Sequence, residues 1–405
     1  MKNDIAKIFG LQAFWIRAII LQPKAIEIEV ELKKKHRCCP RCGKKADYCH
    51  QAGRLRLVKH HLWGERIVYL KGRKSRWQCS RCGKPFTEQW PGLKQWSRKT
   101  ETAEYQLLNL LKGKSFRQLR VENGISDHEA RYLLAKVDTE PNWQEEKKLK
   151  RIKLGVDEHS FRGNDLVITI TNLSQRRLKA ILPDDRQASL RQWLRAVPKP
   201  IKRNISEVCI DMKELFRSAL EQELPGASIV VDHFHVIQDA NRRLGEARRL
   251  EQEMQGRKHI GKRWWFIKGR ENLRGWEKQA LDDLLKRYPE LKSFYYFKEQ
   301  LRLFYKAKTR EEAVTLLSRI ILNMECSDDA AINQWGNTLK RWRMYILNYF
   351  ISKTTNAFTE GAHTKIKMIK RQSYGFRNVQ VYIRKMMLAF IPIAYLGGLI
   401  WHTVC

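Results

Sequence analysis

The feature that most constrains the fold is a succession of short apolar runs in the middle of the chain. Three β-branched runs, RIKLGVDE, DLVITITNL and RRLKAILP, are separated by turns at Arg162-Gly163-Asn164 and Ser174-Gln175. This spacing predicts three antiparallel strands. Helical and strand patterns then alternate as ASLRQWLRAV, SEVCID, MKELFRSALEQEL and SIVVDHFHV. The order β-β-β-α-β-α-β predicts a mixed α/β sheet with helices on its faces.

An aspartate follows three of these apolar runs. Asp157 follows Leu-Gly-Val, Asp211 follows Val-Cys-Ile, and Asp232 follows Ile-Val-Val, so each is expected to end its strand. One aspartate at a strand end is ordinary, because it often starts a turn or caps the next helix. In open α/β sheets, however, functional side chains gather at the carboxyl ends of strands. We therefore expect these three carboxylates at one rim of the sheet.

Glu360 is the only acid in the basic stretch NAFTEGAHTKIKMIKRQSYGFRN, residues 356–378. One interpretation is that it lies in the first turn of a helix, where a carboxylate complements the positive end of the helix dipole. Helical spacing also places it on one face with basic and polar residues, next to an apolar face that can pack on the sheet. The first face comprises His363, Thr364, Lys367 and Arg371, and the second comprises Ala362, Ile366 and Ile369.

Carboxylates gathered in this way are suited to metal-assisted phosphoryl transfer. Mg²⁺ prefers carboxylate oxygens and bridges readily to phosphate, and two such ions ~3.5–4 Å apart can activate the attacking oxygen and stabilise the leaving one. We predict that the three strand aspartates and Glu360 form such a site, with two Mg²⁺ (or Mn²⁺) ions. The nearby bases, Lys367, Lys370 and Arg371, are predicted to contact DNA.

Two C-x-x-C pairs near the N-terminus, each followed by Gly-Lys, indicate a zinc ribbon. Cys39/Cys42 and Cys79/Cys82 would place four thiolates around one structural Zn²⁺. The 36 residues between the pairs exceed the usual spacing of about 15–20. One alternative is two unrelated pairs of free cysteines. Another is a mixed ligand set that draws on Cys38, Cys49, His50 or His61. Period-two alternation over residues 26–32 predicts a strand before this segment.

A helix-turn-helix is predicted between residues 96 and 140. We expect two helices joined by a turn at Asn123-Gly124 in the segment SFRQLRVENGISDHEARYLLAKV. Ser126 and Glu129 have the spacing of a capping box at the start of the second helix. The spacing of Leu119, Ile125, Ala130 and Leu133 fits the core of such a motif. A recognition helix of this kind lies in the major groove. Its DNA-contacting residues would be His128, Arg131 and Tyr132.

The charge of the chain points to a polyanionic partner. The 405 residues carry a formal net charge of +36, with Lys and Arg spread over the whole length, which favours nucleic acid or an anionic membrane surface. The apolar run over residues 386–401 is shorter than the ~20 residues that a membrane helix needs, and Pro392 interrupts it. A secretory signal is not evident, so we expect a cytoplasmic, nucleoid-associated protein that does not bind membranes.

These patterns suggest a multidomain α/β protein. The expected division is N-terminal strands with the zinc ribbon (1–95), the helix-turn-helix (96–140), a sheet core (151–240), an all-helical insertion (241–350), and a C-terminal part of the core with the glutamate (351–405). The sequence patterns within residues 241–350 are helical throughout, so we expect only helices there. A capping box at Thr309 and Glu312 is expected to begin one of them.

Several blocks together resemble the ISL-three family of bacterial insertion-sequence transposases. In chain order they are CPRCG, CSRCG, LGVDEHSFRG, IDM, VVDHFHV and NAFTEGAHTKIKMIKRQSYGFRN. The resemblance covers nearly the whole chain. It implies an RNase H-like core whose Asp-Asp-Glu triad, Asp157, Asp211 and Glu360, holds the Mg²⁺ ions, with a helical insertion before the glutamate. Asp232, in the block VVDHFHV, is then a candidate fourth acid or a substitute for Asp211. His363 stands where the family usually has asparagine.

The function implied by this resemblance is DNA transposition. The enzyme would bind the terminal inverted repeats of its element and catalyse Mg²⁺-dependent strand cleavage and strand transfer. Because two DNA ends must be brought together, a dimer or larger assembly on DNA is expected. Two alternatives share some of these features. One is a zinc-dependent DNA-binding regulator without catalysis, and the other is an RNase H-like nuclease that cleaves without joining strands.

Overall fold

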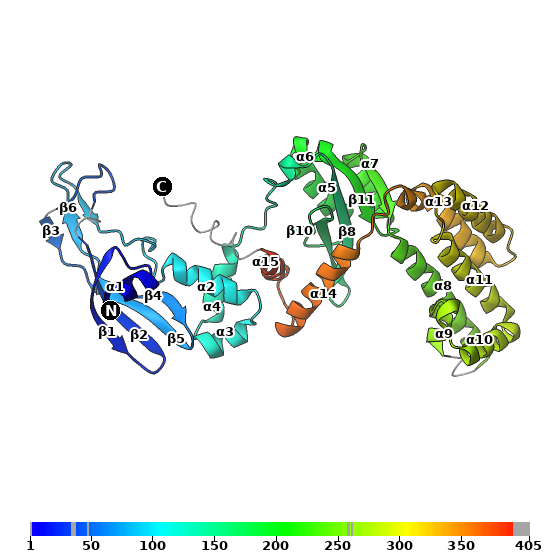
Figure 1. The fold of residues 1–405 in the computed structure, drawn as a ribbon, viewed down its shortest axis with the longest axis horizontal. Coiled ribbons are helices and arrows are strands. Elements are labelled where there is room, and N and C mark those ends of the chain that lie inside the picture. The colour runs from blue at the N-terminus through cyan, green and yellow to red at the C-terminus, as the bar shows by residue number, and fades with distance from the viewer. Residues whose placement is uncertain (1, 34–37, 47, 257–259, 261, 392–405) are drawn as a thin grey trace. The chain divides into compact units, whose positions relative to one another are not determined.

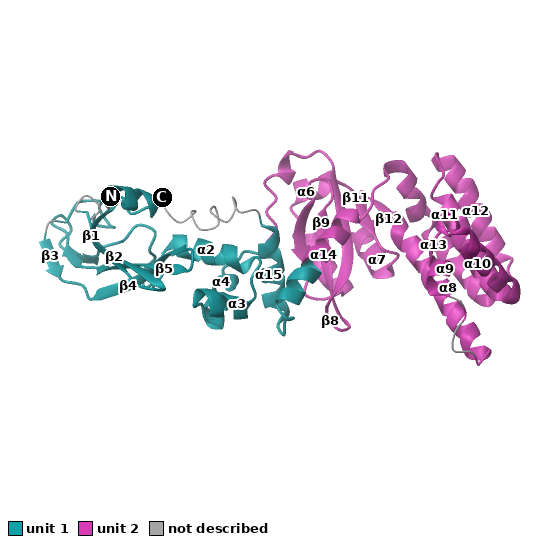
Figure 2. Cartoon of the chain, turned by 60° about the horizontal axis from the view of Figure 1, so that its bottom comes forward, with its two compact units in different colours: residues 1–139, 366–405 teal, residues 140–365 magenta. Residues whose placement is uncertain are grey.

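The computed structural model describes the 405-residue chain except for residues 1, 34–37, 47, 257–259, 261 and 392–405. The chain forms two compact units, coloured separately in Figure 2. Unit 1 comprises residues 1–139 and 366–405, and unit 2 comprises residues 140–365.

Unit 2 is built on a five-stranded mixed sheet, of which Figure 1 labels β10, β8 and β11. The order of its strands is β10-β9-β8-β11-β12. The strands are β8 (Ile152–Arg162), β9 (Asp165–Asn172), β10 (Arg177–Ile181), β11 (Ile205–Ile210) and β12 (Ser228–Val231). The first three form the predicted antiparallel meander, and β11 is parallel to both β8 and β12. The prediction of a mixed α/β sheet is therefore confirmed.

Helices with apolar faces cover this sheet. The shorter ones are α5 (Gln187–Ala196), α6 (Lys199–Asn204) and α7 (Glu214–Glu223), and the turn η2 (Glu146–Lys148) precedes β8. On α5, Leu190 and Leu194 are fully buried, as are Phe216 and Ala219 on α7. These side chains belong to one hydrophobic cluster with the apolar residues of β8, β11 and β12. Burial of the apolar helix faces thus holds the helices on the sheet.

Two expectations about strand ends are corrected by the structure. β8 continues through Asp157 to Arg162, because residues 157–162 stay paired with β9 after the parallel pairing with β11 has ended at Gly155. Asp157 therefore lies within its strand. The run SIVVDHFHV is a strand only as far as Val231, because Asp232 accepts a hydrogen bond from the Phe234 backbone N–H and so caps the following helix.

The rest of unit 2 is helical, as predicted. The elements are α8 (His233–Met254), α9 (Arg263–Ile267), η3 (Arg270–Asn272), α10 (Gly275–Arg287), α11 (Pro289–Phe304), α12 (Arg310–Glu325) and α13 (Ala330–Ser352). The predicted cap at Thr309 is present, since its hydroxyl accepts from the Glu312 N–H. The apolar faces of these helices extend the hydrophobic cluster of the sheet. Helix α14 (Ala357–Gln372) follows and carries Glu360.

Unit 1 begins with a four-stranded sheet in the order β1-β2-β5-β4. Its elements are α1 (Lys2–Ile8), β1 (Phe14–Leu21), β2 (Ala25–Leu32), β4 (Leu55–Trp63) and β5 (Arg66–Arg73). The predicted strand over 26–32 is confirmed, with its apolar residues buried and its glutamates more exposed. A second sheet pairs β6 (Arg76–Gln78) with β3 (Tyr48–Gln51) and β7 (Pro85–Thr87). The β4–β5 hairpin accounts for the long gap between the two cysteine pairs.

Three helices follow, α2 (Glu101–Leu111), α3 (Phe116–Asn123) and α4 (Asp127–Ala135). The turn between α3 and α4 has the predicted chemistry: Gly124 adopts φ +62°, and the Ser126 hydroxyl accepts from the Glu129 N–H. The four predicted core residues are buried in one cluster, which also contains Leu388 of α15 (Val379–Phe390). Helix α15 is therefore part of the core of unit 1.

Among the described residues, no helix is both long and apolar enough to cross a membrane. Of the apolar run over 386–401, the first residues lie in α15 and are buried. Positions 392–401 of that run lie outside the described residues.

Candidate active site

The register of the central strands brings the predicted aspartates to one level of the sheet. Gly155 of β8 pairs with Cys209 of β11, and Ile210 pairs with Val231 of β12. Extending the β8–β11 register by two residues aligns Asp157 with Asp211. Extending the β11–β12 register by one residue aligns Asp211 with Asp232. Neighbouring residues at one level of a sheet project to the same face, so the carboxylates of adjacent strands converge where β11 ends.

The side-chain geometry agrees with this register. Ligand atoms of Asp157, Asp211 and His235 all lie within 4.8 Å of one another, and those of Asp232, His235 and Glu360 form a second such group. Among the described residues, Glu360 does not join Asp157 and Asp211 in a single group at this distance. His235 belongs to both groups, and its Nε2 lies 2.8 Å from Asp211 Oδ1. The predicted triad residues are thus neighbours with His235 between them.

The electrostatics of this cluster reflect an excess of buried negative charge. Burial, followed by the charge of Asp211, raises the pKa of Asp157 to about 7. Burial and the charge of Asp232 also raise the pKa of Glu360. Burial alone would lower the pKa of His235, but its hydrogen bond and ion pair with Asp211 outweigh burial and raise the pKa to about 9. A cation bound among these carboxylates would offset the burial and like-charge repulsion that raise their pKa values.

His235 was not predicted from the sequence. It lies in the first turn of α8, and the signal that could have identified it is the D-x-x-H spacing within VVDHFHV. Because Asp232 caps the helix, a residue three positions later lies one turn in and close to the cap. This places the imidazole beside the carboxylates.

His363 faces Asp157, although helical spacing had grouped it with Glu360. The imidazole is buried, and its Nδ1 lies 3.4 Å from Asp157 Oδ2. Its ring packs on that of His159, with 4.6 Å between centroids, and His159 Nδ1 lies 2.9 Å from the Thr169 hydroxyl. The predicted apolar face of the helix, Ala362, Ile366 and Ile369, is buried as expected.

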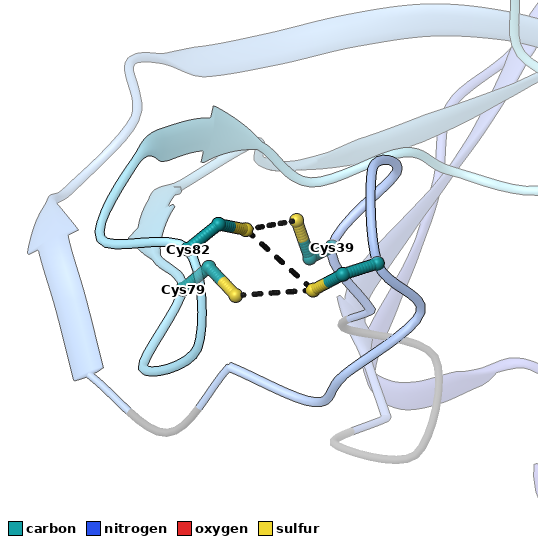
Figure 3. A group of neighbouring side chains, drawn as sticks. Cys39, Cys79 and Cys82 are labelled. Carbon is teal, nitrogen blue, oxygen red and sulfur yellow. Dashed lines mark hydrogen bonds between the residues drawn. The ribbon is translucent and has the colours of Figure 1, made fainter.

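The four predicted cysteines form one cluster, and their sulfur atoms point toward one another (Figure 3). The Sγ–Sγ distances are 3.6 Å for Cys39–Cys82, 3.5 Å for Cys42–Cys79 and 3.5 Å for Cys42–Cys82. Four thiolates at ~2.3 Å from a tetrahedral zinc are separated by about 3.8 Å, so the cluster fits this ion. Cys38 and Cys49 are exposed and lie outside the group.

The two loops that carry these cysteines have the same backbone structure. In each, the first cysteine N–H donates to the carbonyl of the lysine after the glycine, and the glycine N–H donates back to the cysteine carbonyl. Both glycines, Gly43 and Gly83, adopt left-handed φ angles of +70° and +64°, which explains the shared C-x-x-C-G-K pattern. Backbone hydrogen bonding, chiefly from Cys82, lowers the pKa of Cys79 to about 6. This favours the thiolate that a metal requires.

The predicted DNA-contacting residues are located on two helices. His128, Arg131 and Tyr132 are exposed on α4. Arg131 lies over the Phe116 ring at 5.4 Å, and Lys136 Nζ lies 4.5 Å from the centroid of the Tyr132 ring. On α14, Lys367 and Arg371 are exposed, and Lys370 is half-buried.

A profile of the ISL3-type DDE transposases, described as "Transposase", matches residues 154–386. The chain belongs to the ISL3 family. As a DDE transposase it is a catalytic enzyme of DNA transposition with DNA as its substrate, and enzymes of this class use divalent metals. The resemblance seen in the sequence blocks is thereby confirmed.

Two curated relatives extend over most of the transposase. The transposase for insertion sequence element IS1001 of Bordetella parapertussis is 24% identical over 379 residues, which cover 91% of this chain and 92% of the relative. The transposase for insertion sequence element IS1557 of Mycobacterium tuberculosis is 24% identical over 382 residues, covering 87% and 85%. Among solved structures, the Drosophila P element transposase strand transfer complex aligns with a TM-score of 0.36 at 11% identity, over 75% of this chain and 92% of that one.

Proposed function

We propose that this transposase binds the terminal inverted repeats of its own insertion sequence and catalyses metal-dependent cleavage and transfer of the DNA strands at the ends of the element. The observation that carries the proposal is the convergence of Asp157, Asp211 and Glu360 around His235, where the inner strand β11 ends. The sheet supports an RNase H-like assignment. The antiparallel strands β8, β9 and β10 come first in the chain, and β11 and β12 then add in parallel on the other side of β8.

The residues of the cluster fit a divalent cation. Asp157 and Asp211 offer carboxylate oxygens close together. Burial, and then repulsion from Asp211, raise the pKa of Asp157, and a bound cation would offset both effects. Asp157 and Asp211 would hold Mg²⁺ or Mn²⁺, with Glu360 completing the site from α14. When bound, such ions polarise the scissile phosphate and lower the pKa of the attacking water or hydroxyl.

The remaining side chains orient these ligands. His235 holds the Asp211 carboxylate at 2.8 Å. Asp157 Oδ1 accepts the Glu158 backbone N–H at 2.7 Å, and His363 lies beside its other oxygen. Glu158 in turn forms an ion pair with Lys213. With both oxygens of Asp157 positioned, the carboxylate is presented in one orientation, which favours catalysis.

The N-terminal unit supplies features for DNA recognition. Cys39, Cys42, Cys79 and Cys82 would hold a structural Zn²⁺ that joins two loops of a zinc ribbon. Helices α3 and α4 would act as a helix-turn-helix, with α4 in the major groove and Arg131 and Tyr132 toward DNA. Lys367, Lys370 and Arg371 on α14 would contact the phosphate backbone, because phosphate contacts fix position along a duplex. Assembly of at least two chains on DNA follows from the need to join two ends.

The experiment that tests this proposal is a cleavage and strand-transfer assay with purified protein, Mg²⁺, and DNA carrying the ends of its element. Wild-type enzyme should nick at a defined end and join the 3′ end to target DNA. Asp157→Ala, Asp211→Ala and Glu360→Ala should each bind the DNA and fail to cut it. Asp165→Ala is the matched control, because Asp165 is exposed on the same β8–β9 hairpin.

Three outcomes distinguish the possibilities. Cleavage that needs all three acids and is followed by strand joining supports the proposal. Cleavage without joining, and without preference for the terminal repeats, favours a nuclease. Full cleavage by any of the three acid variants would remove that residue from the catalytic site.

A further inference from the structure

Asp232 stands apart from the other acids because both of its carboxylate oxygens accept backbone hydrogen bonds. Its side chain is 1% exposed. Oδ1 accepts from the Phe234 N–H at 3.0 Å and so caps α8. Oδ2 accepts from the Asn356 N–H at 2.8 Å, immediately before α14. His233 Nδ1 also lies 3.1 Å from Oδ1. One carboxylate therefore joins the N-termini of two helices that are distant in sequence.

Asn356 continues this connection toward the catalytic acids. It is fully buried, and its side-chain Nδ2 donates to the carbonyl of Val156, the residue before Asp157, at 3.4 Å. Its own carbonyl accepts the Glu360 N–H at 2.9 Å. A single residue thus contacts the backbone beside Asp157 and the backbone of Glu360.

The first turn of α14 also lies directly on β8. A Cβ added to Gly155 would come within 2.5 Å of Asn356 Oδ1, 2.6 Å of Thr359 Oγ1 and 2.7 Å of Thr171 Oγ1. The Thr359 and Thr171 hydroxyls are themselves 2.7 Å apart. Since any side chain at position 155 would displace these groups, the helix start is fixed against the sheet.

We propose that Asp232 is a positioning residue and not a metal ligand: by holding Asn356, it sets the register of Glu360 against Asp157. This inference rests on the proposed catalytic role of those two acids. Asp232 lies close enough to His235 and Glu360 to share an ion with them, but each of its oxygens already accepts a backbone N–H. The two helix starts therefore set the orientation of this carboxylate. A neutral amide at position 232 could accept one of the two N–H groups, and its NH₂ would face the other donor.

The test compares metal dependence in single-turnover cleavage of element-end DNA. Asp232→Asn should lower the maximal rate by about 10²-fold, the loss expected when a catalytic group shifts by ~1 Å. The Mg²⁺ concentration for half-maximal rate should stay within about twofold of wild type, because no ligand is lost. Asp329→Asn is the matched control: Asp329 caps α13 in the same unit through the Ala331 and Ile332 N–H groups, and its loss should leave the rate unchanged.

Cysteine variants separate positioning from metal binding. Thiolate is a softer ligand than carboxylate and disfavours Mg²⁺, so Asp211→Cys should be inactive with Mg²⁺ and regain activity with Mn²⁺. Asp232→Cys should be equally slow with both ions. Recovery of Asp232→Cys with Mn²⁺ would show that Asp232 is a ligand and overturn the inference, as would a wild-type rate for Asp232→Asn.

A second variant covers the case in which changes at Asp232 prevent folding. Asn356→Ala keeps the backbone N–H that Asp232 binds but removes the bond to the Val156 carbonyl. It should also lower the maximal rate without moving the Mg²⁺ half-saturation, and a wild-type rate would contradict the inference. If Asp157→Ala cleaves normally, the proposed catalytic site itself is wrong, and the positioning role is lost with it. That failure is recognised independently of any variant at 232 or 356.

Discussion

Replacing Asp157 by asparagine is expected to stabilise the transposase in the absence of Mg²⁺ while abolishing cleavage. Burial, and then the charge of Asp211, raises the pKa of Asp157 from 3.8 to about 7. A carboxyl whose pKa is higher in the folded than in the unfolded state binds more protons when folded at any pH between the two values. Its ionisation therefore costs stability as the pH rises from about 4 to about 7, and the loss is complete above pH 7. Asparagine keeps the shape and the acceptor for the Glu158 N–H without the charge.

The magnitude follows from the shift. About three pKa units at ~1.4 kcal/mol each give an upper bound of about 4 kcal/mol at pH 8, and the same relation gives about 1.5 kcal/mol at pH 5. The stability advantage of Asp157→Asn should thus widen by about 2–3 kcal/mol between pH 5 and pH 8. For a unit of this size, ~2–4 °C per kcal/mol predicts a widening of roughly 5–10 °C in Tm.

Differential scanning calorimetry at pH 5, 6, 7 and 8 measures this difference, with zinc retained and no Mg²⁺ added. Asp165→Asn is the control, since Asp165 is 59% exposed in a surface pair with Arg162 and should change stability by less than about 0.5 kcal/mol at every pH. Adding Mn²⁺ should raise the Tm of wild type more than that of Asp157→Asn. If Asp157→Asn is no more stable than wild type at pH 8, then burial and repulsion do not destabilise the ionised Asp157 carboxylate. That result would refute the prediction.

Three further predictions concern other parts of the chain. Cys79→Ser should lower the amount of bound zinc, measured by mass spectrometry, and weaken binding to the terminal repeats. Cys49→Ser should do neither, because Cys49 is exposed and outside the cluster. Equal zinc content in the two variants would refute the four-cysteine site. Glu146→Leu should lower the free energy of unfolding in urea by about 3–5 kcal/mol, because it leaves the buried Lys179, 2.6 Å from Glu146, without its ion-pair partner; a loss below 1 kcal/mol would contradict this. Arg131→Ala should weaken binding to the terminal repeats in a fluorescence anisotropy titration. Arg287→Ala, which removes an exposed arginine of α10, should leave this binding unchanged. Equal effects of the two substitutions would mean that α4 has no special role in binding.

The sequence predicted the local elements of the fold because local patterns carry that information. The β-branched runs identified the strands of the mixed sheet, and the helix-period segments identified α2 to α4 and the helices after α8. Ser126 and Thr309 were predicted as caps, and both accept the expected backbone N–H. The C-x-x-C-G pattern predicted the four clustered cysteines, since each loop closes on its own backbone hydrogen bonds.

The arrangement of the candidate site depended on contacts that no local pattern reports. Strand periodicity cannot tell that β8 continues past Asp157, because its extent is set by pairing with β9 beyond the end of β11. Helical spacing grouped His363 with Glu360, but packing of the buried face turns the imidazole toward Asp157. His235 was overlooked, because its importance comes from its position between two acid groups.

The sequence by itself therefore determined which residue types are available and which segments carry them: four thiolates on two matching loops, three acids that follow short apolar runs, and a glutamate on a basic helix. Only the tertiary structure decided which of the acids lie together at the candidate metal site and which one holds a backbone segment in place. Asp211 and Asp232 follow neighbouring strands in the same way, yet Asp211 faces His235 and Asp157, while Asp232 holds the backbone of Asn356, 124 residues away. The physical reason is that a carboxylate's role depends on which donors surround it, and those donors come from segments that meet only in the folded chain.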